Sequence, residues 1–90
     1  MATDSAKQRA IVRGQFERLL VKCGWNHVIN RRGEFFVKCL ESFELDDQGI
    51  FYWITIAGCG KRLAGLAWDS LPIYLNGAVL SFPNGTTVQL

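Results

Sequence analysis

Charge is distributed very unevenly along this chain, and its C-terminal third has almost none. Between Leu63 and Leu90 the only charged side chain is Asp69, and all ten Lys and Arg residues precede Leu63. An uncharged surface is poorly soluble, so such a segment must be buried in the core of the protein or covered by a partner. This division constrains the fold more than any other feature of the sequence.

The composition predicts one compact domain over residues 1–90 with a large apolar content. Hydrophobic residues make up 49% of the chain, including six Phe, three Trp and two Tyr. This content excludes a disordered chain, and it is more than one small core readily hides, because a small domain has much surface for its volume. We therefore expect a homo-oligomer or a tight protein partner.

The net charge of +2 conceals a basic N-terminal part and an acidic middle. Residues 1–38 carry a local charge of +5, and residues 39–62 carry a local charge of −2. This asymmetry favours an anionic partner at the basic end, although a solvated helix and loops explain it equally well.

Nothing in the sequence predicts secretion or a membrane span. The chain begins without an apolar signal region, and no run approaches the roughly 18 apolar residues that a spanning helix needs. Three cysteines are an odd number, which fits a reducing compartment better than a disulfide framework. We expect a cytoplasmic protein, or one that works inside a host cell if it is viral.

The clearest predicted element is an amphipathic helix over residues 6–23. Ser5 and Gln8 have the spacing of a capping box, and Gly24 supplies a stop. Apolar residues recur on one face at helical spacing. They are Val12, Phe16, Leu19 and Cys23, with Ile11 and Leu20 beside them.

After Gly24 an alternating pattern predicts an antiparallel β region over residues 25–90. Residues 25–29 predict a strand and residues 30–33 a hairpin turn. Residues 34–45 predict a single second strand, which places Phe35, Val37, Cys39, Phe43 and Leu45 on one face. Residues 50–57 are apolar on both faces apart from Thr55, which is typical of a central strand.

The rest of the chain predicts short strands near residues 73–75, 78–82 and 86–90, while residues 63–68 stay undecided between a helical turn and an irregular crossing. The predicted fold class is α+β, in which one N-terminal amphipathic helix packs on an antiparallel, meander-like sheet of five or six strands. The alternative is a small, partly open β-barrel with an N-terminal helix.

No motif indicates a reaction. Cys23, His27, Cys39 and Cys59 are the donor types of a zinc site, but they lack the close paired spacing of structural zinc ligands. The Gly-Lys pair at residues 60–61 lacks the first glycine of a phosphate-binding loop. With one histidine and carboxylates gathered near a predicted turn, we predict no enzyme activity, no catalytic residue, no metal and no cofactor.

The predicted function is a small non-enzymatic protein-binding module. It is either an assembly subunit, for example of a virion, or a stoichiometric inhibitor or adaptor of a larger protein. The charge-poor segment supplies the predicted interface, because interface cores are depleted in charge and enriched in aromatic residues. The predicted interface residues are Trp68, Ile73, Tyr74, Leu75, Phe82 and Val88. The alternative is that this segment forms half of the internal core.

Two charged groups complete the predicted sites. An acidic patch that can guide association with a basic protein surface consists of Glu41, Glu44, Asp46 and Asp47. The alternative function is nucleic-acid binding through the basic helix, with phosphate contacts from Lys7, Arg18, Lys22, Arg31 and Arg32. Trp25 or exposed sheet aromatics could then stack on single-stranded bases. We expect no membrane partner and no small-molecule substrate.

Overall fold

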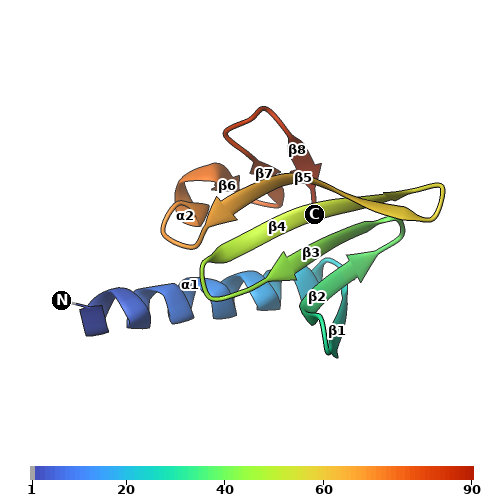
Figure 1. The fold of residues 1–90 in the computed structure, drawn as a ribbon. Helices are drawn as coiled ribbons and strands as arrows, with labels where there is room; N and C mark the ends of the chain where they lie inside the picture. Colours follow the sequence, from blue (N-terminus) through green and yellow to red (C-terminus); the bar gives the residue numbers. More distant parts are fainter. Residues whose placement is uncertain (1) are drawn as a thin grey trace.

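The computed structural model describes residues 2–90, which form a long helix, a five-stranded antiparallel sheet and a three-stranded antiparallel sheet (Figure 1). The fold is α+β and the large sheet is open, so the predicted class is confirmed and the barrel alternative is wrong. In chain order the elements are α1 (Ala2–Lys22), β1 (Asn26–Asn30), β2 (Gly33–Lys38), β3 (Glu41–Leu45), β4 (Gly49–Ile56), β5 (Cys59–Ala67), α2 (Leu71–Tyr74), β6 (Leu75–Asn76), β7 (Val79–Ser81) and β8 (Thr87–Gln89).

Helix α1 begins at Ala2, upstream of the predicted start, so Ser5 lies inside the helix instead of capping it. The predicted stop is present, because Gly24 follows the last turn with a φ of +92°, a conformation that glycine adopts at little cost. The predicted apolar stripe is also present, and its buried members are Val12, Phe16 and Leu20.

The large sheet is a meander in the order β1-β2-β3-β4-β5. The predicted strand over residues 34–45 is wrong, because a two-residue turn at Cys39 and Leu40 divides it into β2 and β3. Cys39 has a φ of +55°, which is uncommon for a residue other than glycine. Because Cys and Leu occupy this turn instead of Gly, Pro, Asn, Asp or Ser, the sequence gives no signal for it.

This turn changes which residues share a face of the sheet. Successive side chains of a strand point to opposite faces, so a two-residue turn places Phe36 opposite Phe43 in the register. Phe35 and Val37 therefore lie on the opposite face from Phe43 and Leu45, contrary to the prediction that all four share one face.

The two faces of the large sheet differ in coverage. The inner face carries all the buried hydrophobic side chains that β1–β5 contribute, which are Phe36, Phe43, Leu45, Ile50, Tyr52, Ala64 and Leu66. Both α1 and the small sheet pack against this face. The outer face carries half-buried side chains instead, including Phe35, Val37, Phe51 and Trp53.

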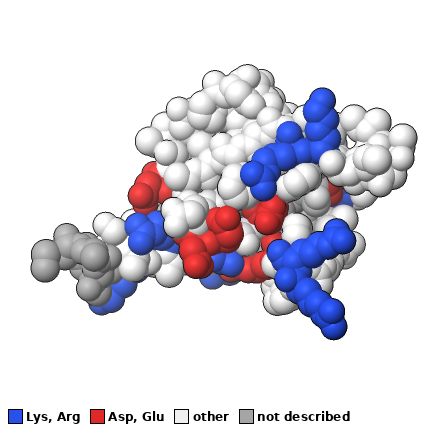
Figure 2. Space-filling view, viewed as in Figure 1, with Lys and Arg blue, Asp and Glu red and all other residues white. Residues whose placement is uncertain are grey.

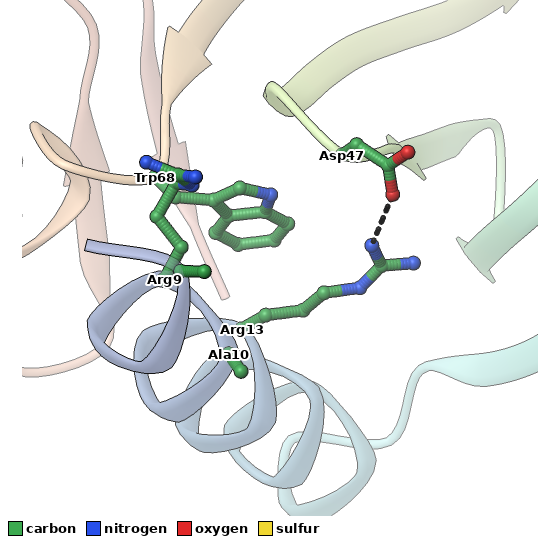
Figure 3. A pocket seen from close by; sticks show the side chains of 6 residues that line it. Arg9, Ala10, Arg13, Asp47 and Trp68 are labelled. Atoms are coloured by element: carbon green, nitrogen blue, oxygen red, sulfur yellow. Dashed lines mark ion pairs between the residues drawn. The ribbon is translucent and has the colours of Figure 1, made fainter. Parts of the chain in front are cut away.

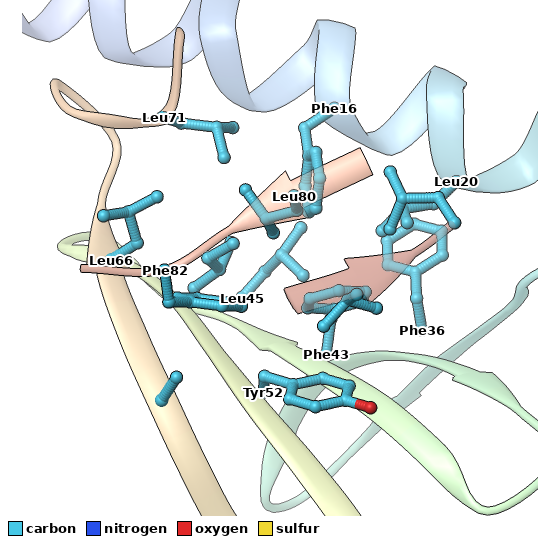
Figure 4. Close-up of a cluster of buried hydrophobic side chains, with 14 of the residues drawn as sticks. Phe16, Leu20, Phe36, Phe43, Leu45, Tyr52, Leu66, Leu71, Leu80 and Phe82 are labelled. Carbon is cyan, nitrogen blue, oxygen red and sulfur yellow. The ribbon is translucent and has the colours of Figure 1, made fainter. Parts of the chain in front are cut away.

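Aromatic contacts join the helix and both sheets into one core (Figure 4). Phe16 of α1 meets Phe43 edge to face at 5.5 Å between ring centroids, and it meets Trp68 at 6.2 Å. Tyr52 on the large sheet stacks on Phe82 after β7 at 6.1 Å. Such pairs contribute about 0.5–1.5 kcal/mol beyond the area they bury.

The charge-poor segment supplies a large share of this core. Its undecided first part is a strand, β5, and the small sheet that follows packs on the inner face beside α1. Its buried side chains are Ala64, Leu66, Trp68, Leu71, Leu80, Phe82, Val88 and Leu90. In Figure 2 the part of the surface formed by α2 and β6–β8 is white, so the lack of charge persists at the surface.

Replacing Phe16 tests whether the helix-to-sheet contact holds the fold together. Phe16→Ala removes a ring that is 1% exposed, and we expect the free energy of unfolding to fall by about 3–5 kcal/mol. Urea denaturation measures the change. Ile73→Ala is the control, because Ile73 is 79% exposed and its loss should change stability by less than about 0.5 kcal/mol. Equal effects of the two substitutions would contradict this packing.

Candidate functional site

The six predicted interface residues have very different exposures. Trp68, Phe82 and Val88 are buried, which supports the core alternative for these three. Tyr74 and Leu75 are half-buried, and of the six only Ile73 offers most of its side chain to a partner.

The four predicted acidic residues do not form one patch. Glu41 lies on the inner face of β3, where its Oε1 accepts a hydrogen bond from the Tyr52 hydroxyl at 2.6 Å. Burial together with this hydrogen bond raises the pKa of Tyr52 above its usual range. Glu44 lies on the outer face, where its Oε1 accepts a hydrogen bond from the Trp53 indole at 3.0 Å.

The other two acidic residues belong to the β3–β4 turn. The Asp46 carboxylate accepts hydrogen bonds from the backbone N–H groups of Gln48 and Gly49 at 2.8 and 2.9 Å. Asp47 is exposed and lies 3.8 Å from the Arg13 guanidinium. Asp46 therefore shapes the turn, as the sequence predicts for Asp at such a position.

The predicted basic residues are also divided. Lys7, Arg18 and Lys22 are exposed on α1, whereas Arg31 and Arg32 form the β1–β2 turn. Arg32 lines a hollow on the outer face of the sheet, on the opposite side from the face on which α1 packs. The five residues thus belong to two separate surfaces.

An ionic cluster connects α1 to the edge of the large sheet. Arg13 donates a hydrogen bond to Glu34 at 2.6 Å, and the Nε2 atom of His27 lies 2.7 Å from the other Glu34 oxygen. Burial raises the pKa of Glu17, and the neighbouring Glu34 raises it further. Burial opposes ionisation of Glu34 as well, but hydrogen bonds from Glu17, Arg13 and His27 outweigh it and lower the pKa of Glu34.

Three members of this cluster have donor atoms that suit a divalent cation. One ligand atom each from Glu17, His27 and Glu34 lies within 4.8 Å of the other two. The guanidinium of Arg13 already supplies positive charge at Glu34, at 2.6 Å. The cluster is therefore satisfied as an ion-pair network that fixes the helix on the sheet.

Beside this network, a hollow of about 280 Å³ separates α1 from the β3–β4 turn (Figure 3). Arg13 crosses it, donating to the Asp46 carbonyl at 3.1 Å and pairing with Asp47. The Trp68 indole donates to the same carbonyl at 2.8 Å. Because the polar groups here bind one another, they join α1 to the β3–β4 turn and leave little hydrogen-bonding capacity for a ligand.

The outer face contains a second, larger hollow of about 360 Å³. Two aromatic side chains, Phe35 and Trp53, line it together with the small residues Ser42 and Gly60. The register places Ser42 opposite Trp53 and Phe35 opposite Glu44. Thr55, Arg32 and Arg62 complete the lining. We call this site the outer hollow.

Contacts among the side chains hold the outer hollow in shape. The Arg62 guanidinium carbon lies 4.0 Å from the Phe51 ring centroid and 5.0 Å from that of Trp53, within cation–π distance of both. Glu44 accepts the Trp53 indole hydrogen bond and lies 3.7 Å from Arg62. Gly65 leaves room for Phe51, because a Cβ at Gly65 would approach the ring to 2.9 Å.

Positive charge flanks this hollow. In Figure 2 one group of Lys and Arg lies over β4 and β5, and another lies by β1 and β2, on the same side of the molecule. The turn between β1 and β2 contributes Arg31 and Arg32, and β5 contributes Arg62. The acidic residue on the outer face between them is Glu44. Lys61 lies opposite Ile54 in the register and therefore on the other face of the sheet.

Sequence reasoning did not select Phe35, Phe51, Trp53 or Arg62 as site residues. A signal was present, because residues 50–57 are apolar on both faces, as in a strand that is covered on both sides. In the structure, the described residues cover only the inner face of this strand, and its outer face remains partly exposed.

No family model matches this chain, and no curated protein or solved structure was found to be significantly similar to it. Within the part of the chain that the structure describes, neither helix combines the length and the apolar character needed to cross a membrane.

The ionic cluster predicts opposite effects for two matched substitutions. Glu34→Gln removes a carboxylate with a lowered pKa, so it should destabilise the protein above the ordinary pKa of 4.5, and this loss should vanish as the pH falls through the lower folded-state value. Glu17→Gln removes a carboxylate whose raised pKa disfavours folding at neutral pH, so it should stabilise the protein there. Urea unfolding between pH 3 and 7 measures both effects; equal signs at pH 7 would refute this view of the cluster.

Proposed function

We propose that this protein is a non-enzymatic binding protein that takes up single-stranded nucleic acid on the outer face of its large sheet. The observation that carries the proposal is the outer hollow, where Phe35 and Trp53 lie beside Arg32 and Arg62. Aromatic rings that stack on bases, set in a positively charged groove, are the combination that single-strand binding proteins use.

The apolar part of the argument concerns strand β4. Its outward residues Phe51 and Trp53 are large aromatics of the kind usually buried by a second layer, yet the outer face has none among the described residues. A stacked base supplies such a layer, and each one contributes about 1–3 kcal/mol in known cases. Stacking accepts any base, because every base has a π-face.

The electrostatic part concerns the rim. Arg31 and Arg32 lie at the β1–β2 turn, and Arg62 lies on β5 opposite Trp53, so phosphates on either side of a bound base meet cations. Neutralised phosphates release counterions, which makes such binding strongly dependent on salt. Protein interfaces are also enriched in aromatic residues and arginine, so a protein ligand is the alternative outcome of the test below.

The basic face of α1 fits nucleic acid less well. Lys7, Arg18 and Lys22 are exposed, but Trp25, the aromatic residue nearest to the end of this helix, is only 3% exposed and cannot stack on a base. The helix therefore offers phosphate contacts without a stacking surface.

Fluorescence anisotropy of labelled single-stranded RNA and DNA at about 50 mM salt tests the proposal, because electrostatic binding is strong at that ionic strength. Trp53→Ala should weaken binding by about tenfold, the loss expected for one stacking ring. Arg62→Glu should weaken binding more than Arg18→Glu, which makes the same charge change on α1.

Two results would contradict this proposal. The wild type could fail to bind either nucleic acid, or Arg18→Glu could abolish binding that Arg62→Glu leaves intact, which would assign the function to α1. If the wild type binds neither nucleic acid but captures a protein that Trp53→Ala does not, the outer face would be assigned to a protein ligand.

A second candidate function, self-assembly, rests on strand β1. This strand is at an edge of the sheet, its residues are all exposed, and its sequence Asn26–Asn30 contains no Lys, Arg, Asp or Glu. Edge strands are usually protected by charge, and an edge without it can pair antiparallel with its own copy about a twofold axis. Val28 and Ile29, which are 38% and 73% exposed, would be covered in such a dimer.

Light scattering after size exclusion on reduced, tag-free protein tests this candidate. The wild type should have the mass of a dimer, and Ile29→Lys should convert it to a monomer, because two like charges would then meet across the paired edges. Ile73→Lys, at a similarly exposed position away from β1, should leave the dimer intact. A monomeric wild type at about 100 µM, or a dimer that withstands Ile29→Lys, would reject pairing through β1.

A further inference from the structure

We propose that Glu44 makes the outer hollow selective for guanine among the four bases. This inference rests on the proposed function, since it concerns which base the hollow accepts. It begins from a feature that phosphate binding does not explain: a carboxylate stands in a hollow whose other charged side chains are Arg32 and Arg62.

The position of Glu44 is fixed by its neighbours. Its Oε1 accepts the Trp53 indole N–H at 3.0 Å and lies 3.7 Å from the Arg62 guanidinium. Among the groups that the structure describes, none forms a hydrogen bond with its Oε2, and the side chain is 22% exposed. The carboxylate therefore lies at the edge of the stacking ring, with acceptor capacity left for a ligand.

An ionised carboxylate only accepts hydrogen bonds, so the base must present donors. Guanine presents two adjacent donors on its Watson–Crick edge, N1–H and the N2 amino group. Adenine and cytosine present an amino group beside an acceptor nitrogen, and uracil and thymine present one N–H between two carbonyl oxygens. Guanine is thus the one of the four bases that can place two adjacent donors, and no acceptor between them, against Glu44.

The arginines suit the other edge of the same base. Guanine carries two acceptors, O6 and N7, which arginine commonly binds with two parallel hydrogen bonds. Arg32 and Arg62 line the hollow together with Glu44, so donors for this edge and an acceptor for the Watson–Crick edge converge on one place. A hollow of about 360 Å³ is also at the small end of the range for ligand pockets, which fits one base better than several.

The test uses oligouridine 12-mers with one central guanine, adenine, cytosine or inosine, and measures each dissociation constant by anisotropy in one buffer. The wild type should bind the guanine oligomer about tenfold more tightly than the adenine and cytosine oligomers. The inosine oligomer, which lacks the N2 amino group, should bind several-fold more weakly than the guanine oligomer. The inosine comparison needs no variant, so it does not depend on the folding of a mutant.

Glu44→Gln should abolish the preference for guanine while retaining binding to the adenine and cytosine oligomers. The Gln side chain keeps an oxygen that can accept the Trp53 indole hydrogen bond, but its amide group is a donor where the carboxylate is an acceptor. Asp47→Asn makes the same charge change at an exposed turn residue and should leave the preference unchanged. Equal binding of the guanine, adenine and cytosine oligomers, or a guanine preference that survives Glu44→Gln, would overturn this inference and leave the proposed function standing. Failure of the wild type to bind any oligomer would overturn both.

Discussion

The structure depends on a sheet that is covered on one face only. A chain of 90 residues provides one long helix and one small sheet as covering layers, and both are used on the inner face. The contact of Phe16 with Phe43 and Trp68 shows why, because these rings form a shared centre for the helix, the large sheet and the charge-poor segment. Nothing among the described elements is left to cover Phe51 and Trp53 from outside.

This allocation explains where most of the apolar side chains of the uncharged third lie. The segment from Leu63 onward contributes the final half of β5 and the small sheet, so its largest side chains face inward. The charged first two thirds supply the solvated surface of α1 and of the outer hollow. The outer hollow, where aromatic residues and charge occur together, is therefore a better candidate for a binding site than the charge-poor segment.

Local signals in the sequence were sufficient for the helix stripe, its stop at Gly24 and the apolar character of β4. They failed at Cys39 and Leu40, where the turn has none of the residues that usually mark one. Periodicity continues through such a turn without a visible break, so the sequence pattern predicts the wrong face for Phe35. The outer hollow was unpredictable for a related reason: only the register of β4 and β5 places Arg62 opposite Trp53.

The free protein must keep this aromatic face in water, and Arg62 shows how it does so. Its guanidinium stacks on Phe51 and reaches Trp53, while Glu44 lies near its charged end. Arginine is weakly hydrated and planar, so it can shield a ring and still present its outer donors to a ligand. Because the same contacts hold Glu44 and Trp53 in place before binding, little side-chain ordering remains for association, and binding to a preorganised site is favoured. One set of interactions thus shields the exposed aromatics and preorganises the hollow for the proposed ligand.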